Sequence, residues 1–135
     1  MQELIWPRFI GPQQINLKLD RVLKLLSRLN NPQEQLKNII HVAGTNGKGS
    51  TLAFLQNLLT EDGDEINIYT SPHLVNFSER IVIQGKEIDN KNLTRILQQC
   101  KEYEELTPQI HTTFFEGTAV AAFVAFAASN ATYNL

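Results

Sequence analysis

The sequence has a single cysteine, no cluster of basic residues, no long hydrophobic run and no internal repeat. Because Cys100 is alone, an internal disulfide and a cysteine zinc site are excluded, which is compatible with a reducing compartment. Twelve Lys and Arg residues stand against fourteen Asp and Glu residues, so the charge balance does not predict a nucleic-acid partner. The most apolar segment, Thr118–Ala128, has about half of the roughly 20 residues that a membrane-spanning helix needs, and no membrane partner is predicted.

The first ten residues lack the basic start and apolar centre of a signal peptide, so we expect a cytoplasmic protein. The 135 residues, 42% hydrophobic and 19% charged, fit one ordinary globular domain. Residues 1–16 contain Pro7, Gly11 and Pro12 without a sustained period and are interpreted as an irregular N-terminal arm. The domain is expected over residues 17–135.

The most informative stretch runs from Asn38 to Phe54, where an apolar segment ends in the loop GTNGKGST (44–51) and a helical pattern follows. This layout is typical of a phosphate-binding loop, because glycines allow close backbone approach and a helix N-terminus adds partial positive charge. Lys48 is predicted to contact the β- and γ-phosphates and to be the catalytic residue of the loop. Backbone and hydroxyl contacts are expected from Gly44, Thr45, Asn46, Gly47, Gly49, Ser50 and Thr51.

The spacing departs from the usual Walker pattern, since two residues separate Gly44 from Gly47 and Gly49 stands between Lys48 and Ser50. A glycine-rich turn that binds nothing is the weaker alternative.

Periodicity predicts helices and strands on both sides of this loop. Helices are expected over 17–29, from the loop to about residue 61, from Asn90 through Cys100, and from about Thr118 to Ser129. Strands are expected at 39–43, 66–70, 81–83 and from residue 132. The first of these is apolar throughout, which indicates a central parallel strand covered on both faces. The pattern predicts an α/β fold with three layers and a mainly parallel sheet, of the P-loop ATPase type.

Several motifs carry a resemblance to a known family: HVAGTNGKGST (41–51), YTSPHL (69–74), Phe77, ERI (79–81), and FFE (114–116) with Thr118. They closely resemble dihydrofolate synthase/folylpolyglutamate synthase, a member of the Mur ligase superfamily, from about Ile15 onward. The Gly-Thr-Asn-Gly-Lys element is shared by the superfamily, whereas Gly49-Ser50 together with Ser71–Leu74 points to the folate branch. The resemblance implies a Mur ligase central-domain-like fold.

The resemblance further implies ATP-dependent ligation of L-glutamate to dihydropteroate or folate through an acyl phosphate, with ATP and Mg²⁺ as cofactors. It assigns Ser71 and Glu116 as metal ligands, and both are expected at strand ends on the sheet edge that carries the phosphate loop. The alternatives are a turn-forming hydroxyl before Pro72 and a carboxylate that stabilises a helix N-terminus. His73, Phe77 and Arg80 are weaker candidates for substrate contacts, with packing as the alternative.

The family's proteins are several times longer, and their C-terminal glutamate-binding domain has no counterpart in the sequence. We therefore expect the chain to be the front part of a longer, monomeric protein and to be inactive in ligation on its own. Two alternatives stay open: a Mur-type cell-wall precursor ligase, and a non-catalytic nucleotide-binding fragment.

Overall fold

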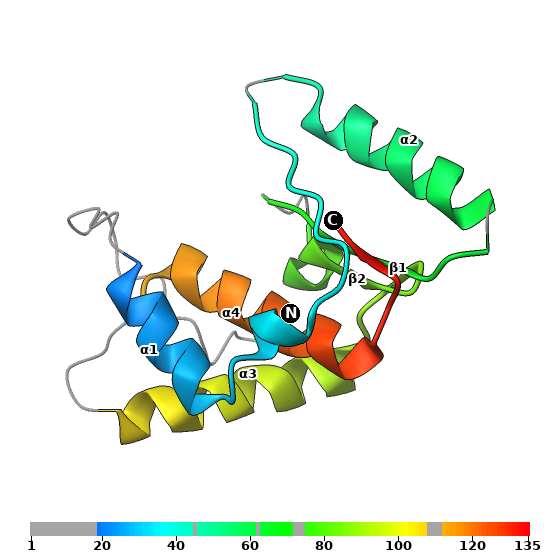
Figure 1. The fold of residues 1–135 in the computed structure, drawn as a ribbon. Coiled ribbons are helices and arrows are strands. Elements are labelled where there is room, and N and C mark those ends of the chain that lie inside the picture. The colour runs from blue at the N-terminus through cyan, green and yellow to red at the C-terminus, as the bar shows by residue number, and fades with distance from the viewer. Residues whose placement is uncertain (1–18, 45, 62, 72–74, 108–111) are drawn as a thin grey trace.

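The chain alternates helices with short strands, in the computed structural model, over the described residues 19–44, 46–61, 63–71, 75–107 and 112–135. Figure 1 shows the helices on two sides of a small sheet. In chain order the elements are α1 (Asp20–Arg28), the 3-10 helix η1 (Pro32–Gln35), α2 (Lys48–Glu61), β1 (Ile66–Tyr69), the 3-10 helix η2 (Phe77–Arg80), β2 (Ile81–Ile83), β3 (Lys86–Glu87), α3 (Asn90–Leu106), α4 (Phe114–Ser129) and β4 (Tyr133–Asn134).

The sheet has the strand order β3-β2-β1-β4 and is mixed. β1 pairs in parallel with β4, whereas the pairs β1–β2 and β2–β3 are antiparallel. The β2–β3 hairpin turns on Gln84 and Gly85, whose φ angles of 50° and 83° suit a two-residue turn of the primed type. The predicted α/β class is confirmed. The sheet is partly parallel, because the antiparallel pairs β1–β2 and β2–β3 stand beside the parallel pair β1–β4.

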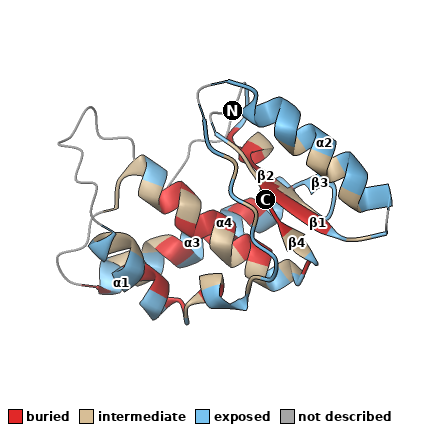
Figure 2. Ribbon diagram, turned by 45° about the horizontal axis from the view of Figure 1, so that its top comes forward, coloured by how far each residue is buried: buried red, intermediate tan, exposed pale blue. Residues whose placement is uncertain are grey.

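The two faces of β1 contact different helices. Ile66 and Ile68 are buried beside the half-buried Leu52, Leu55 and Leu59 of α2, whereas Tyr69 packs with the core formed by α1, α3 and α4. This alternation follows from the two-residue period of a strand. Figure 2 shows buried segments in α1, α3 and α4 and in β1, whereas α2 is largely exposed. The sheet therefore lies between α2 and the other helices.

Asparagines end two of the helices where the sequence predicts. Asn30 and Asn31 follow α1 with φ angles of 66° and 50°, and the Asn31 amide donates to the Leu26 carbonyl at 2.8 Å. Asn130 ends α4 with a φ of 54°. Asparagine tolerates this left-handed geometry, which closes the last turn of a helix.

The predicted strand at 39–43 is wrong in its extent and burial. The segment forms one parallel bridge, between Ile39 and Asn134, and the Ile40 amide donates to the Asn134 carbonyl at 2.8 Å. Ile39 is 59% exposed. A continuous apolar strand is stable when both of its faces are covered, and the described residues provide little cover at this edge beyond β4.

α4 begins at Phe114, four residues earlier than predicted. Its N-terminus is a capping box in which the Thr113 hydroxyl accepts from the Glu116 amide and the Glu116 carboxylate accepts from the Thr113 amide. After Thr118 the helix is apolar up to Ala128, yet no helix within the described ranges is long and apolar enough to cross a membrane. The expectation that a strand ends just before Glu116 is therefore wrong, since Glu116 lies in the first helical turn.

Candidate nucleotide-binding site

The glycine-rich loop is an exposed turn that leads directly into α2. Gly44 and Gly47 have φ angles of 150° and 80°, and a Cβ atom added to Gly47 or Gly49 would meet nothing within 4 Å. The left-handed φ of Gly47 strains any residue with a side chain. The glycines therefore leave open space beside the backbone amides, which a phosphate group fits.

The first turn of α2 favours an anion. Lys48 is the first residue of this 14-residue helix, and the turn contains no acidic side chain. Thr51 anchors the turn, because its amide and its hydroxyl both donate to the Gly47 carbonyl, at 2.9 Å and 2.8 Å. Lys48, Ser50 and Thr51 are all exposed. A lysine and the first amides of a helix at one exposed position are the elements of a polyphosphate site.

The structure places most of the predicted loop residues together at this turn. Gly44, Asn46, Gly47, Gly49, Ser50 and Thr51 lie with Lys48 in or beside the first turn of α2. Thr45 and His73 lie outside the described residues. The contacts of each side chain with a nucleotide stay a prediction.

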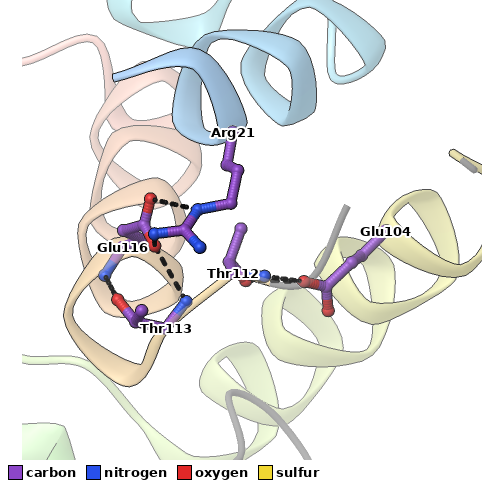
Figure 3. Close-up of polar contacts among 5 residues, drawn as sticks. All are labelled: Arg21, Glu104, Thr112, Thr113 and Glu116. Atoms are coloured by element: carbon purple, nitrogen blue, oxygen red, sulfur yellow. Dashed lines mark hydrogen bonds and ion pairs between the residues drawn. The ribbon is translucent and has the colours of Figure 1, made fainter. Parts of the chain in front are cut away.

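Glu116 makes three polar contacts with its carboxylate (Figure 3). Oε1 lies 2.9 Å from Nη2 of Arg21 and accepts from the Thr113 amide at 3.0 Å. Oε2 accepts from Nε of Arg21 at 3.3 Å. The side chain of Glu116 is 14% exposed and that of Arg21 is 28% exposed. A partly buried carboxylate is stabilised by such a paired cation, and the arginine fork suits both oxygens.

Ser71 is exposed two residues after the end of β1, and a side-chain contact joins this end of the strand to the start of α4. The Tyr69 hydroxyl lies 3.0 Å from Oγ1 of Thr118, which in turn donates to the Phe115 carbonyl at 2.9 Å. Tyr69 precedes Ser71 by two residues, and Thr118 follows Glu116 by two. The contact therefore brings the segments that carry the two predicted metal ligands to the same region of the fold.

Phe77 and Arg80 belong to the packed interior. Both are buried, and the Arg80 guanidinium carbon lies 5.6 Å from the centre of the Phe77 ring and 5.2 Å from that of Phe114. The two rings meet edge to face at 6.0 Å. These cation–π and edge-to-face contacts account for the burial of both residues by packing. Their predicted contacts with substrate stay untested.

Two contact residues of this region are additional to those that the sequence singles out: Arg21 and Thr113. Tyr69 and Thr118 lie within the family motifs, but the sequence assigns them no role. The Thr113-Phe114-Phe115-Glu116 sequence carries the signal of a capping box, which would have placed the helix start correctly. Arg21 carries no such signal, because it is 95 residues away from Glu116 and looks like any charged residue of an amphipathic helix.

Comparison with known proteins gives a consistent result, although no family model matches the chain. The chain is 38% identical over 112 residues to the dihydrofolate synthase/folylpolyglutamate synthase of Bacillus subtilis, which covers 81% of the chain and 26% of that protein. It is 36% identical over 113 residues to the dihydrofolate synthetase of Saccharomyces cerevisiae, covering 76% of the chain and 26% of that protein. The chain thus spans about a quarter of the length of the curated relatives it matches.

A solved structure agrees with these relatives. The bifunctional folylpolyglutamate synthase/dihydrofolate synthase of Yersinia pestis, complexed with AMPPNP and Mn ion, is similar with a TM-score of 0.82 and 31% identity. The match covers 93% of the chain and 30% of that structure. The fold is therefore an α/β domain of the Mur ligase type. Within that type, the resemblance to the dihydrofolate synthase/folylpolyglutamate synthase family is confirmed over most of the chain.

The glycine turn fits ATP more completely than Glu116 fits the implied metal ion. The open glycine turn, with Lys48 and an acid-free helix start, fits the phosphates of a nucleotide. No group of three His, Cys, Asp or Glu side chains that could hold a metal ion occurs among the described residues. Glu116 nevertheless fits a single-oxygen ligand, since Oε2 has one donor in the described contacts and an ionised carboxylate oxygen accepts two. Magnesium bound beside phosphates takes one or two carboxylates and keeps several waters.

Proposed function

We propose that these residues form the nucleotide-binding part of an enzyme that uses ATP to join L-glutamate to dihydropteroate or folate. The observation that carries the proposal is the open glycine turn that ends in Lys48 at the start of α2. The names of the relatives support the folate substrate over a cell-wall precursor. A cytoplasmic location belongs to the same proposal.

The chemistry requires two anions, a carboxylate and a triphosphate, to meet. The carboxylate oxygen attacks the γ-phosphorus, ADP leaves, and the amine of glutamate then displaces phosphate from the acyl phosphate. Lys48 and the amides of the α2 start reduce the repulsion between these anions and hold the triphosphate in line. They act as fixed charges and dipoles that are present before the reaction begins.

Glu116 and Ser71 are proposed to hold the magnesium ion, which when bound screens the phosphates and stabilises the charge that develops on them. The capping box orients the Glu116 carboxylate through the Thr113 amide. Tyr69 and Thr118 fix the end of β1 against the start of α4. Ser71 then supplies a hydroxyl from an exposed position two residues after the strand.

The test joins the 135 residues to the remaining part of the Bacillus subtilis relative and supplies ATP, Mg²⁺, dihydropteroate and glutamate. The fusion is expected to release ADP and to form dihydrofolate only when dihydropteroate and glutamate are both present. The same fusion with Lys48→Ala is the control and is expected to form neither. A fusion that binds AMPPNP but makes no dihydrofolate would refute the ligase proposal and favour a non-catalytic nucleotide-binding role.

A further inference from the structure

The Glu116 carboxylate is held by two independent sets of contacts. One comes from its own helix, because the Thr113 amide donates to Oε1 at 3.0 Å. The other comes from α1, where Arg21 approaches both oxygens, at 2.9 Å and 3.3 Å (Figure 3). Removal of Arg21 therefore leaves the carboxylate oriented by the capping box. Without Arg21, the negative charge of the Glu116 carboxylate is no longer paired with this guanidinium.

We propose that Arg21 acts through its charge on Glu116 and lowers the affinity of this carboxylate for a divalent cation. This inference rests on the proposed function, in which Glu116 is a metal ligand. Arg21 neutralises the carboxylate when no cation is bound, and it repels a cation that approaches Oε2. The nucleotide phosphates must then supply most of the affinity for the metal, so that the cation binds with the nucleotide rather than before it.

The size of the effect follows from the contact distances. A magnesium–oxygen bond of about 2.1 Å, added to the contacts at 2.9 Å and 3.3 Å, places the cation roughly 5 Å from the guanidinium. Repulsion between the single charge of the guanidinium and the double charge of the cation at that separation weakens cation binding roughly tenfold even in water. Because Glu116 is only 14% exposed, the tenfold figure is a lower limit.

The test measures Mn²⁺ binding to the 135-residue chain by the spectroscopic signal of free Mn²⁺, without nucleotide and with AMPPNP. Arg21→Gln is expected to bind Mn²⁺ about tenfold more tightly than the unmodified chain. Arg28→Gln is the matched control, since it removes an exposed arginine from the last turn of the same helix, and it is expected to change nothing. Arg21→Lys keeps the charge, so its affinity for Mn²⁺ is expected to stay within a factor of about three of that of the unmodified chain.

The outcomes separate this inference from the proposed function. If Glu116→Gln weakens Mn²⁺ binding while Arg21→Gln leaves it unchanged or weaker, Arg21 has only a structural role and the inference is wrong. If Glu116→Gln also leaves Mn²⁺ binding unchanged, Glu116 is not a metal ligand, and that part of the proposed function is wrong together with the inference. Should Arg21→Gln fail to fold, a tenfold change in either direction for the folded Arg21→Lys chain would overturn the inference, because the charge is preserved.

Discussion

Replacement of Asn67 is predicted to cost about a third of the stability of the domain. This residue of β1 is 0% exposed. Its amide nitrogen donates to the Ser129 hydroxyl at 2.6 Å and to Oδ1 of Asn134 at 3.0 Å, and its oxygen accepts from the Gln84 amide at 3.1 Å. The side chain thus joins β1 to β4, to the hairpin turn and to the end of α4.

The magnitude follows from these three bonds. At about 1 kcal/mol for each hydrogen bond, Asn67→Ala is expected to lower the free energy of unfolding by about 3 kcal/mol. Domains of this kind have about 5–15 kcal/mol in total. Urea unfolding followed by circular dichroism would show the midpoint falling by about 1.5 M at an m value of roughly 2 kcal/mol/M. A fall of less than about 0.5 M would refute the claim that this buried amide holds the sheet together.

Asn67→Asp tests the same site through the direction in which stability changes with pH. Burial disfavours the charged form, so the pKa of an aspartate at this position is raised above its usual value of about 3.9. A group whose pKa is raised on folding contributes stability below its unfolded pKa and loses it as the pH rises through the folded pKa. The variant is therefore expected to lose stability between about pH 4 and pH 7. Asn57→Asp, at an exposed position of α2, is the control and should show no such loss.

Two further variants test separate contacts. Thr113→Ala removes the hydroxyl that accepts from the Glu116 amide and should lower the free energy of unfolding by about 1 kcal/mol, whereas Thr113→Ser should restore it; equal melting temperatures for the two variants would contradict the capping box. Burial raises the pKa of Cys100 from 9.0 to about 12, so stability is fully present below pH 9 and should fall by about 1.4 kcal/mol per pH unit above it. Cys100→Ala should lack this alkaline fall, and a slope that persists in the variant would show that other groups cause it.

Local signals in the sequence were sufficient for much of the fold. The helix predicted over 17–29 ends where Asn30 and Asn31 adopt left-handed geometry, and the strand predicted at 81–83 ends at the Gln84-Gly85 turn. These features depend on backbone geometry that a few neighbouring residues determine. The start of α4 was misplaced although Thr113 and Glu116 carry the capping signal, because the aromatic pair between them also suits a strand.

The long-range part of the structure could not be derived from one sequence. The Ile39–Ala43 run has the composition of a covered strand, but its burial depends on which elements pack against it. The contact between Arg21 and Glu116 joins residues 95 positions apart, and nothing local distinguishes Arg21 from other charged residues of α1. The glycine turn at the start of α2 was predictable because its glycines, lysine and helix start are consecutive in the chain, and its binding of phosphate stays a prediction.

The most direct test of the nucleotide-binding proposal is the affinity of the chain for AMPPNP with Mg²⁺, measured calorimetrically for three proteins. Lys48→Ala removes the lysine at the first position of α2, and Lys91→Ala removes an exposed lysine from the first turn of α3 as a matched control. The unmodified chain and Lys91→Ala are expected to bind equally well, while Lys48→Ala should bind at least about tenfold more weakly, because it loses a charge-assisted phosphate contact of about 1.5–3 kcal/mol. Equal affinity of all three proteins, or no binding by any of them, would contradict the phosphate-binding role of the glycine loop.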